Sequence, residues 1–182
     1  MARTKVQPSK KVFISEADQY LFGQGTHYDI YKKLGAHLSE ENGEKGTYFA
    51  VWAPNAEKVH VVGDFNEWKE SDTYKLTKLG DVGIWSLFVP WVGEGELYKF
   101  LITTKDGRKL YKADPYANYA ELRPGTASIV TDISGFAWKD DKWMSERDKK
   151  DVNRQPMAVY ECHIGSFMKH PNGTEDGFYK YR

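Results

Sequence analysis

From Gly46 to Val130 the sequence alternates between apolar and polar residues, and this alternation is the feature that most limits the possible fold. A period of two places the apolar side chains on one face of a strand, and short strands at spacings of roughly 8–15 residues are typical of antiparallel sandwiches. The segments that show it are residues 47–54, 58–65, 73–79, 83–90, 96–104, 108–114 and 127–132. We therefore predict an all-β fold, an immunoglobulin-like β-sandwich, over residues 46–132.

Two local features of this region carry further predictions. Asp106-Gly107 lies between two alternating segments and favours the positive φ angles of a type I′ turn, so we expect a hairpin there. Trp52 and Trp85 lie inside predicted strands, and the alternation favours a place in the core for both.

Residues 13–45 are predicted to form a helical N-terminal segment. Two stretches in it begin with Ser or Thr followed three residues later by Asp, a capping-box pattern, and each runs to a glycine: residues 15–23 and 26–35. Helices so short cannot bury their own aromatic side chains, so the segment is expected to pack against a larger unit. Residues 1–12 are basic with no apolar run after them, which predicts a disordered tail rather than a signal peptide.

The C-terminal part loses the alternation. Residues 133–156 contain a charged run that ends at a proline and are predicted to be a linker. In residues 157–182 a new strand is expected over MAVYECHI, followed by a loop and the start of a helix at Phe178. Because one strand and part of a helix cannot make a domain, we expect this segment to be the truncated beginning of a (β/α)8 barrel that continues beyond Arg182.

Composition excludes several classes of function. The 26 basic and 26 acidic residues give no excess charge for a nucleic-acid or acidic-membrane partner. A single cysteine cannot form an internal disulfide or a multi-cysteine zinc site, and no apolar run approaches the roughly 20 residues that span a bilayer. The expectation is a cytoplasmic protein with no membrane segment, no metal and no cofactor.

No residue pattern predicts catalysis within the chain. Asp64 and Glu67 are two carboxylates in one turn, but a glycosidase needs its pair on either side of a substrate, and turn carboxylates usually hold the turn itself. Cys162 and His163 are neighbours in a predicted strand, where adjacent side chains point to opposite faces. Phosphate-loop, GxSxG and HExxH motifs are absent from the sequence.

Binding is better supported, because aromatic residues make up 15% of the chain and one of them occupies a turn. Trp68 follows the strand that ends at Gly63, and a flat indole ring with polar neighbours is the usual surface for the C–H face of a sugar. Two interpretations stay open: an exposed sugar platform, or a ring that covers the end of the core. Lys99 lies between two aromatic residues and is expected to point outward if those rings are in the core.

The region from Gly46 to Val130 contains, in order, the runs FAVWAPNAEKVHVVGDFNEW, GIWSLFVP, LYKFLIT, KADPYA and RPGTASIV. In these runs it resembles the family 48 carbohydrate-binding modules that precede the catalytic barrel in glycogen branching and debranching enzymes. The flanking runs YLFGQGTHYDIYKKLGAH and MAVYECHIGSF look like those of the 1,4-α-glucan branching enzyme family, the second being the first strand of a family 13 barrel.

The resemblance implies an enzyme that cleaves α-1,4 bonds and forms α-1,6 branches in glycogen, by a retaining mechanism with an aspartate nucleophile and a glutamate acid/base. The motifs of those catalytic residues would lie beyond Arg182, so the chain alone is expected to be inactive. Its implied partners are α-glucan, as glycogen or maltooligosaccharides, and its own catalytic barrel. Alternatives are a non-catalytic glycogen-binding module, or the N-terminal part of a related debranching or trehalose-releasing hydrolase.

The resemblance also implies a surface sugar site. Trp68 matches the turn tryptophan that stacks on glucan in related glycogen-binding domains, Lys99 matches their lysine, and Asn66 of the same turn completes the predicted carbohydrate-binding set. Two positions depart from the pattern, because Lys109 stands where a second tryptophan is expected and Ser128 where an asparagine is expected. We therefore predict an exposed Trp68 with a weak, roughly millimolar affinity for glucan.

Overall fold

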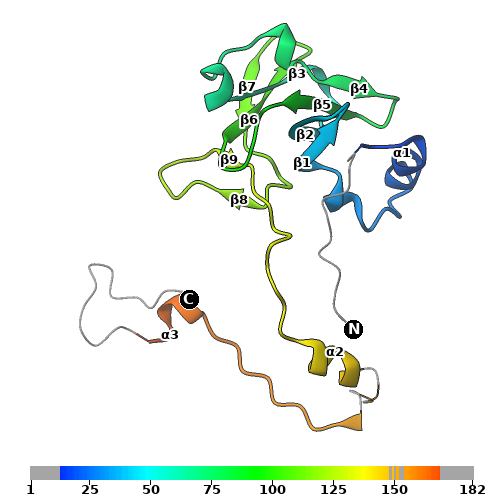
Figure 1. Ribbon diagram of the computed structural model, residues 1–182, viewed down its shortest axis with the longest axis vertical. Coiled ribbons are helices and arrows are strands. Elements are labelled where there is room, and N and C mark those ends of the chain that lie inside the picture. Colours follow the sequence, from blue (N-terminus) through cyan, green and yellow to red (C-terminus); the bar gives the residue numbers. More distant parts are fainter. Residues whose placement is uncertain (1–12, 148, 150, 152–153, 169–182) are drawn as a thin grey trace. The chain divides into compact units, whose positions relative to one another are not determined.

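The computed structural model of the protein describes residues 13–147, 149, 151 and 154–168 (Figure 1). The chain divides into two compact units, residues 1–136 and 137–182, which are considered separately.

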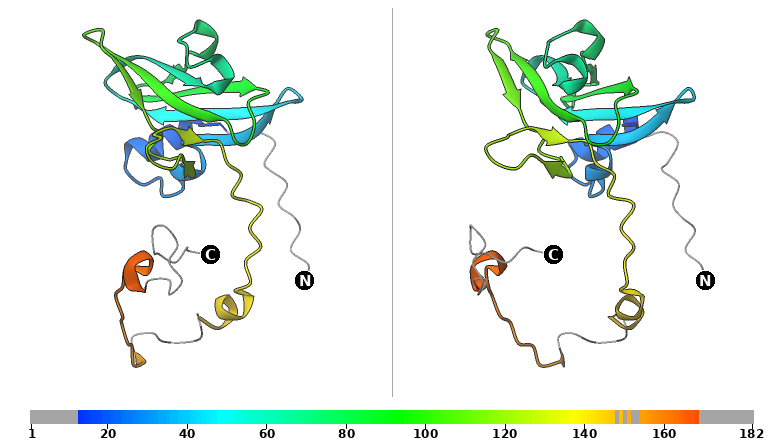
Figure 2. Two further views of the ribbon diagram at one scale, coloured as in Figure 1. Left: turned by 90° about the vertical axis from the view of Figure 1, so that its left-hand side faces the viewer. Right: turned by 60° about the vertical axis from the view of Figure 1, so that its left-hand side comes forward.

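Two antiparallel sheets make up most of the first unit, which confirms the predicted all-β sandwich (Figure 2). The four-stranded sheet has the order β1 (Gly35–Glu41), β2 (Glu44–Trp52), β5 (Ile84–Pro90), β4 (Thr77–Leu79). The five-stranded sheet has the order β3 (Ala56–Gly63), β6 (Leu97–Thr104), β9 (Ser128–Ile129), β8 (Tyr119–Ala120), with β7 (Lys109–Lys112) also paired to β6.

The main core lies between the two sheets and is built from alternate residues of their strands. Phe49 from β2 and Tyr98 and Phe100 from β6 have no exposed surface, and the rings of Phe49 and Tyr98 meet edge to face at 5.1 Å. Trp85 of β5 joins this core at 6% exposure and donates from Nε1 to the carbonyl oxygen of Ala53 at 3.0 Å, so its predicted core position is confirmed.

A second, smaller apolar cluster covers the other face of the four-stranded sheet. There the N-terminal segment contributes Ile14, Ile30 and Leu34, which pack with Tyr48, Ala50 and Ile84. Phe22 of helix α1 (Glu16–Gly23) also packs against this cluster. The prediction that the segment packs against a larger unit is therefore confirmed, although Tyr28 remains 87% exposed.

The predicted core position of Trp52 is wrong, because this side chain is 52% exposed and does not lie between the sheets. Val51 points into that core, so its neighbour in β2 must point the other way, toward the face that the N-terminal segment covers. There Trp52 meets Phe22 edge to face at 5.9 Å and donates from Nε1 to the carbonyl oxygen of Val82 at 2.9 Å. Both faces of β2 carry apolar residues, and for that reason the alternation alone misplaced this ring.

The first predicted helix forms and the second does not. In α1 the Ser15 hydroxyl accepts from the backbone N–H of Asp18 at 3.2 Å, while the Asp18 carboxylate accepts from the backbone N–H of Ser15 at 2.8 Å. In place of the helix predicted over residues 26–35 the structure has a 3-10 turn, η1 (Ile30–Lys32), with no side-chain cap, and β1 begins at Gly35. The Asp29 carboxylate, expected to cap a helix, pairs instead with Lys32 at 2.8 Å.

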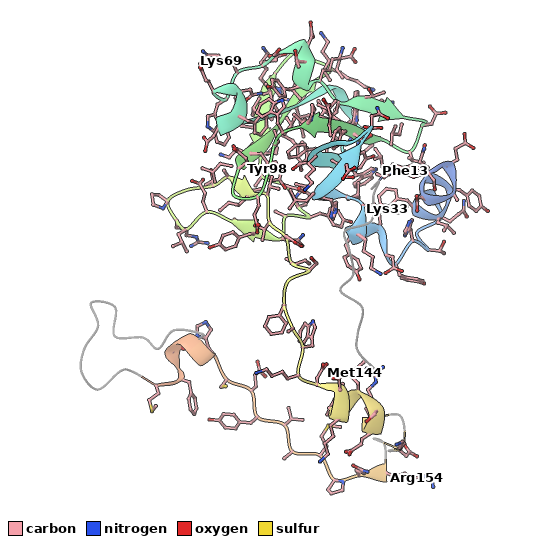
Figure 3. All side chains as sticks on the ribbon, in the orientation of Figure 1. Phe13, Lys33, Lys69, Tyr98, Met144 and Arg154 are labelled. Atoms are coloured by element: carbon pink, nitrogen blue, oxygen red, sulfur yellow. The ribbon has the colours of Figure 1, made fainter. Side chains whose placement is uncertain are left out.

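Asp18 holds the N-terminal segment together as well as capping α1. Its carboxylate lies 2.6 Å from Nζ of Lys33 and 2.7 Å from Nε2 of His27. Burial by itself would raise the pKa of Asp18, but the hydrogen bonds from Lys33, Ser15 and His27 together hold it well below its ordinary value. Figure 3 shows Lys33 close to Phe13, whose backbone oxygen also accepts from Nζ at 3.3 Å.

The sandwich begins earlier than the alternation predicted. Strand β1 occupies residues that were assigned to the helical segment 13–45, and it pairs along its whole length with β2. The turn between them is Asn42-Gly43, whose φ angles of 53° and 85° are both positive, as a type I′ turn requires. The β-sandwich therefore begins at Gly35 and not at residue 46, where the sequence analysis placed its start.

The hairpin at Asp106-Gly107 is confirmed, but its turn is of another type. Gly107 has a φ of 82° whereas Asp106 has no positive φ, so the pair does not form a type I′ turn. The Gly107 N–H donates to the carbonyl oxygen of Thr104 at 2.9 Å, and the Thr104 N–H donates to that of Arg108 at 3.0 Å. This is the three-residue hairpin loop with a left-handed glycine at its end.

In the second unit the structure describes two short helices, α2 (Asp141–Arg147) and α3 (Ile164–Phe167). Helix α2 lies within the segment predicted to be a linker. The predicted strand at residues 157–164 does not form: Val159 is 84% exposed, and no described residue pairs with this stretch. A strand needs a neighbour for its backbone N–H and C=O groups, which explains the difference. The helix expected at Phe178 lies outside the described residues.

Within the described part of the chain, no helix has the length and apolar character needed to cross a membrane.

Candidate functional site

The candidate site lies on the face of the five-stranded sheet that points away from the core. Residues that oppose each other in an antiparallel pair share a face, and the pairs Val59–Ile102 and Val61–Phe100 point inward. The alternate pairs therefore point outward. We call this the outer surface, and it comprises His60, Val62, Lys99, Leu101, Thr103, Lys109 and Tyr111.

A tight turn at the end of β3 borders the outer surface. The 3-10 turn η2 (Asp64–Asn66) follows Gly63, where a Cβ atom would lie 2.1 Å from the carbonyl oxygen of Leu97, so only glycine fits. Asn66 holds the turn: its Oδ1 accepts from the N–H of Gly63 at 2.9 Å and its Nδ2 donates to the carbonyl oxygen of Val61 at 3.2 Å. The predicted binding residue Asn66 thus makes backbone contacts that shape the turn.

Trp68 projects from this turn and is half-buried, so it is less exposed than predicted. Glu67 and Trp68 both have left-handed backbone, with φ of 55° and 60°, and the Trp68 N–H donates to the carbonyl oxygen of Gly63 at 2.9 Å. Its Nε1 donates to Oδ1 of Asp64 at 2.8 Å. Trp68 belongs to neither apolar cluster of the described residues, so the ring is positioned mainly by the turn.

The carboxylates of the turn have local partners. Asp64 accepts from the Trp68 indole, and the Glu67 carboxylate pairs with Lys69, which lies at the rim of the sandwich in Figure 3. Both contacts lie in exposed surroundings, as expected of turn carboxylates rather than of a catalytic pair.

Lys99 lies on the outer surface as predicted, directly opposite Val62. Tyr98 and Phe100 on either side of it point into the core with no exposed surface. The ammonium group of Lys99 donates to the hydroxyl oxygen of Thr126 at 2.6 Å, which holds the side chain along the sheet.

Lys109 forms an ion pair with Glu70 across the outer surface, where the resemblance had placed a second tryptophan. The hydrogen bond from Lys109 lowers the pKa of Glu70, and the carboxylate in turn raises the pKa of Lys109. Beside this pair His60 is only 2% exposed, with its Nδ1 3.8 Å from Oε1 of Glu70 and without a hydrogen bond. Burial lowers the pKa of His60, although the charge of Glu70 opposes that effect.

Ser128 belongs to the core and not to the outer surface, because it is 1% exposed. Its hydroxyl oxygen accepts from the N–H of Asp114 at 2.9 Å, and the Asp114 carboxylate accepts from the Tyr98 hydroxyl at 2.6 Å. Burial raises the pKa of both Asp114 and Tyr98. Ser128 therefore supports a buried polar network and offers no surface group to a sugar.

Tyr111 was missed at the level of sequence. It lies opposite Leu101 on the outer surface and is 53% exposed. The signal was the alternation of β7, since residues 109 and 111 must share a face.

The second unit brings no catalytic pair together among its described residues. His163 contacts the hydroxyl of Ser166 through Nδ1 at 2.9 Å, and Cys162 is an exposed free thiol. In the described part of the chain, no three His, Cys, Asp or Glu residues gather in a way that would hold a metal ion.

Comparison with known proteins connects this geometry to a family. Residues 33–117 match carbohydrate-binding module 48, the isoamylase N-terminal domain. Over 96% of its length the chain is 71% identical to a 1,4-alpha-glucan branching enzyme of Butyrivibrio fibrisolvens, and over 92% it is 48% identical to that of Bacillus caldolyticus. It covers 27% and 25% of those two proteins, so the chain spans about a quarter of the length of these relatives.

Among solved structures, a Salmonella typhimurium protein that carries the name alpha amylase superposes on 74% of the chain with a TM-score of 0.50. The two sequences are 23% identical and the match covers 20% of that protein, so the likeness shows the fold alone.

Proposed function

We propose that this chain, whose residues 33–117 are a carbohydrate-binding module of family 48, is part of a cytoplasmic 1,4-alpha-glucan branching enzyme. The observation that carries the proposal is 71% identity to one such enzyme over 96% of the chain. In the whole enzyme an α-1,4 bond of a glucan is cleaved and the released chain is rejoined through an α-1,6 bond. The part described here binds α-glucan and supports the catalytic barrel.

The outer surface and its bordering turn supply the groups that a glucan needs. A glucose ring has a flat C–H face that stacks on an aromatic side chain, and hydroxyls around its edge that require hydrogen-bond partners. Trp68 is the proposed stacking ring, held in place by its bond to Asp64. Lys99 is the proposed donor to a hydroxyl oxygen, and Asn66 keeps the turn in shape. Tyr111 adds an exposed aromatic side chain to the same surface.

The chemistry belongs to the part of the relatives that this chain does not span. A retaining reaction at a glycosidic bond needs two carboxylates about 5–5.5 Å apart, one as nucleophile and one as acid/base. The carboxylates Asp64 and Glu67 are occupied by Trp68 and Lys69. We therefore propose that carboxylates in the part of the enzyme that this chain does not span carry out the transfer.

Calorimetric titration of the chain with maltoheptaose tests the binding proposal. We expect a dissociation constant of roughly 1 mM, which corresponds to about 4 kcal/mol. Trp68→Ala should weaken it about 2- to 10-fold, since a ring contact contributes about 0.5–1.5 kcal/mol beyond area burial. Tyr28→Ala is the matched control, because it removes an aromatic ring that is 87% exposed on the N-terminal segment and should leave affinity unchanged.

Two outcomes would contradict this assignment of Trp68. One is a Trp68→Ala protein that binds as tightly as the unaltered chain. The other is a Trp68→Ala protein whose circular dichroism spectrum shows that it no longer folds, which would make the ring a structural one.

The proposed division of labour has its own test. The chain incubated with amylose should leave the absorbance of the amylose–iodine complex unchanged, because branching shortens the helical segments that bind iodine and lowers that absorbance. A fall in absorbance with time would show that catalytic groups lie within these residues.

A further inference from the structure

Trp91 has a combination of properties that core packing does not explain. It follows β5 directly, has a left-handed φ of 62° and leaves 62% of its surface exposed. A bulky side chain at positive φ is unfavourable and persists only where the surroundings hold it. Here its N–H donates to the carbonyl oxygen of Lys45 at 2.8 Å, which fixes the backbone. Glycine would meet the same backbone requirement without strain.

The ring of Trp91 lies at the end of the sandwich that carries the Trp68 turn. Its centroid is 6.4 Å from that of Phe65, and the two ring planes are inclined at 77°. Phe65 belongs to the turn η2 and also packs against the core. Because Trp91 touches Phe65 and Trp68 touches Asp64, two indole rings flank a single 3-10 turn.

A comparison with Trp85 separates Trp91 from a core tryptophan. Trp85 comes from the same strand, is 6% exposed and belongs to the main cluster. Trp91 belongs to neither apolar cluster of the described residues. A ring that is held by its backbone and by one aromatic edge, with its remaining surface in water, is arranged like an aromatic contact for a ligand.

We propose that Trp91 is a second aromatic contact for α-glucan, so that a longer glucan chain extends from Trp68 to Trp91 around the η2 end of the sandwich. This inference rests on the proposed glucan binding at Trp68. It also accounts for the second ring that the outer surface lacks at residue 109, where Lys109 is paired with Glu70. A short oligosaccharide engages one ring, whereas a chain long enough to reach both gains the second contact without a second association step.

The test compares maltotriose with maltoheptaose on the unaltered chain and on Trp91→Gly. Glycine accepts the φ of residue 91, so the protein should still fold, and the loss of the exposed ring and its contact with Phe65 should change the melting temperature only slightly. We expect Trp91→Gly to weaken maltoheptaose binding about 2- to 10-fold, the range for one lost ring contact, and to leave maltotriose binding unchanged. Trp91→Tyr should restore part of the affinity for maltoheptaose, because it returns an aromatic ring.

The outcomes are distinguishable from a failure of the proposed function itself. If the unaltered chain binds neither sugar, both proposals fail together. If Trp68→Ala lowers affinity but Trp91→Gly does not, glucan binding stands and this inference is overturned. The inference is also overturned if Trp91→Gly lowers the melting temperature and weakens both sugars equally. Tyr111→Ala tests the alternative that Tyr111 is the second contact. If this variant, and not Trp91→Gly, loses the tighter binding of maltoheptaose over maltotriose, the second contact lies on the outer surface.

Discussion

The two faces of the five-stranded sheet are built from the same strands and carry different kinds of side chain, although Val62 and Leu101 of the outer surface are also fully buried. The inner face of β3 and β6 carries Val59, Val61, Tyr98 and Phe100, all with no exposed surface and all packed in one cluster. The outer surface of those strands mixes apolar and polar side chains. His60 and Thr103 there each have a buried polar atom without a hydrogen-bond partner in the described structure.

Because of this difference, substitutions on the inner face should alter the stability of the domain, and substitutions on the outer surface should alter its binding and protonation. On the inner face the side chains are closely packed, so truncating one of them lowers the free energy of unfolding. On the outer surface the polar groups interact across a partly covered sheet, so a change should appear in binding, protonation or salt dependence.

The largest expected effect follows from emptying the inner face. Phe100→Ala should lower the free energy of unfolding by about 3–5 kcal/mol, the range for removing a fully buried phenylalanine. Tyr111→Ala, on the neighbouring strand and 53% exposed, should change it by no more than about 0.5 kcal/mol. Urea denaturation of both variants measures the difference. Equal losses would mean that the Tyr111 ring contributes as much packing as the buried ring of Phe100.

Alternation in the sequence was sufficient to predict this inner face. The seven predicted segments correspond to strands β2 to β7 and β9, because each carries apolar residues at every second position between turn-forming residues. The prediction from alternation was wrong where the burial of a side chain does not depend on its position in the alternating pattern. Trp52 lies on a face that only the N-terminal segment covers, and a local pattern cannot show which distant segment packs there.

The missed strand β1 had a clear local signal. Asn42-Gly43 is a strong signal for a two-residue hairpin turn, and its flanking residues pair from Glu41–Glu44 to Gly35–Ala50. The capping-box patterns upstream of Gly35 predicted a helical segment over residues 13–45, which includes this strand. The second expected helix failed for a related reason: a capping pair favours a helix, but tertiary packing of Ile30 and Leu34 decided the local shape.

A smaller effect is expected from the polar network that crosses the inner face. Tyr98→Phe removes the hydroxyl that donates to the buried Asp114 carboxyl at 2.6 Å. A buried acceptor without its partner typically costs about 1–3 kcal/mol, and urea denaturation should show a loss in this range. Tyr111→Phe is the matched control and should have almost no effect. A Tyr98→Phe protein as stable as the unaltered chain would show that water or another group satisfies Asp114.

The candidate site was only partly predictable. Trp68 and Lys99 stay predicted binding residues, and only the outward direction of Lys99, which followed from the alternation around it, is confirmed. The burial of Ser128 was not predictable, because it depends on Asp114, which is distant in sequence and approaches it only in the fold. The exposure of Trp91 at positive φ was also hidden, since nothing in the run FVPWVGEGE distinguishes a strained surface tryptophan from a buried one.

The next effect concerns protonation on the outer surface. Burial lowers the pKa of His60 below its ordinary value of 6.5, so the unfolded state binds more protons than the folded state when the pH falls through 6.5. Stability should therefore decrease from pH 7.5 to pH 5.5, by at most about 1.4 kcal/mol per pH unit for one proton. His60→Gln should reduce that decrease while the other histidines remain. Identical pH profiles for the two proteins would exclude His60 as the cause.

Lys109→Met should have the smallest effect on stability. It is informative because it should change the pKa of His60. Lys109→Met removes the ion pair with Glu70, which is partly exposed and should contribute little to stability at pH 7.5. It also leaves the Glu70 carboxylate without the Lys109 ammonium group, 3.8 Å from Nδ1 of His60.

The negative charge of Glu70 then favours protonated His60 more strongly, so the pKa of His60 should rise toward its ordinary value. The loss of stability at acid pH should therefore become smaller. Titration of the His60 ring protons by NMR measures this directly, with Lys112→Met on the same strand as the control. A His60 pKa that is the same in both variants would show that Glu70 does not act on the imidazole, and that burial alone sets its behaviour.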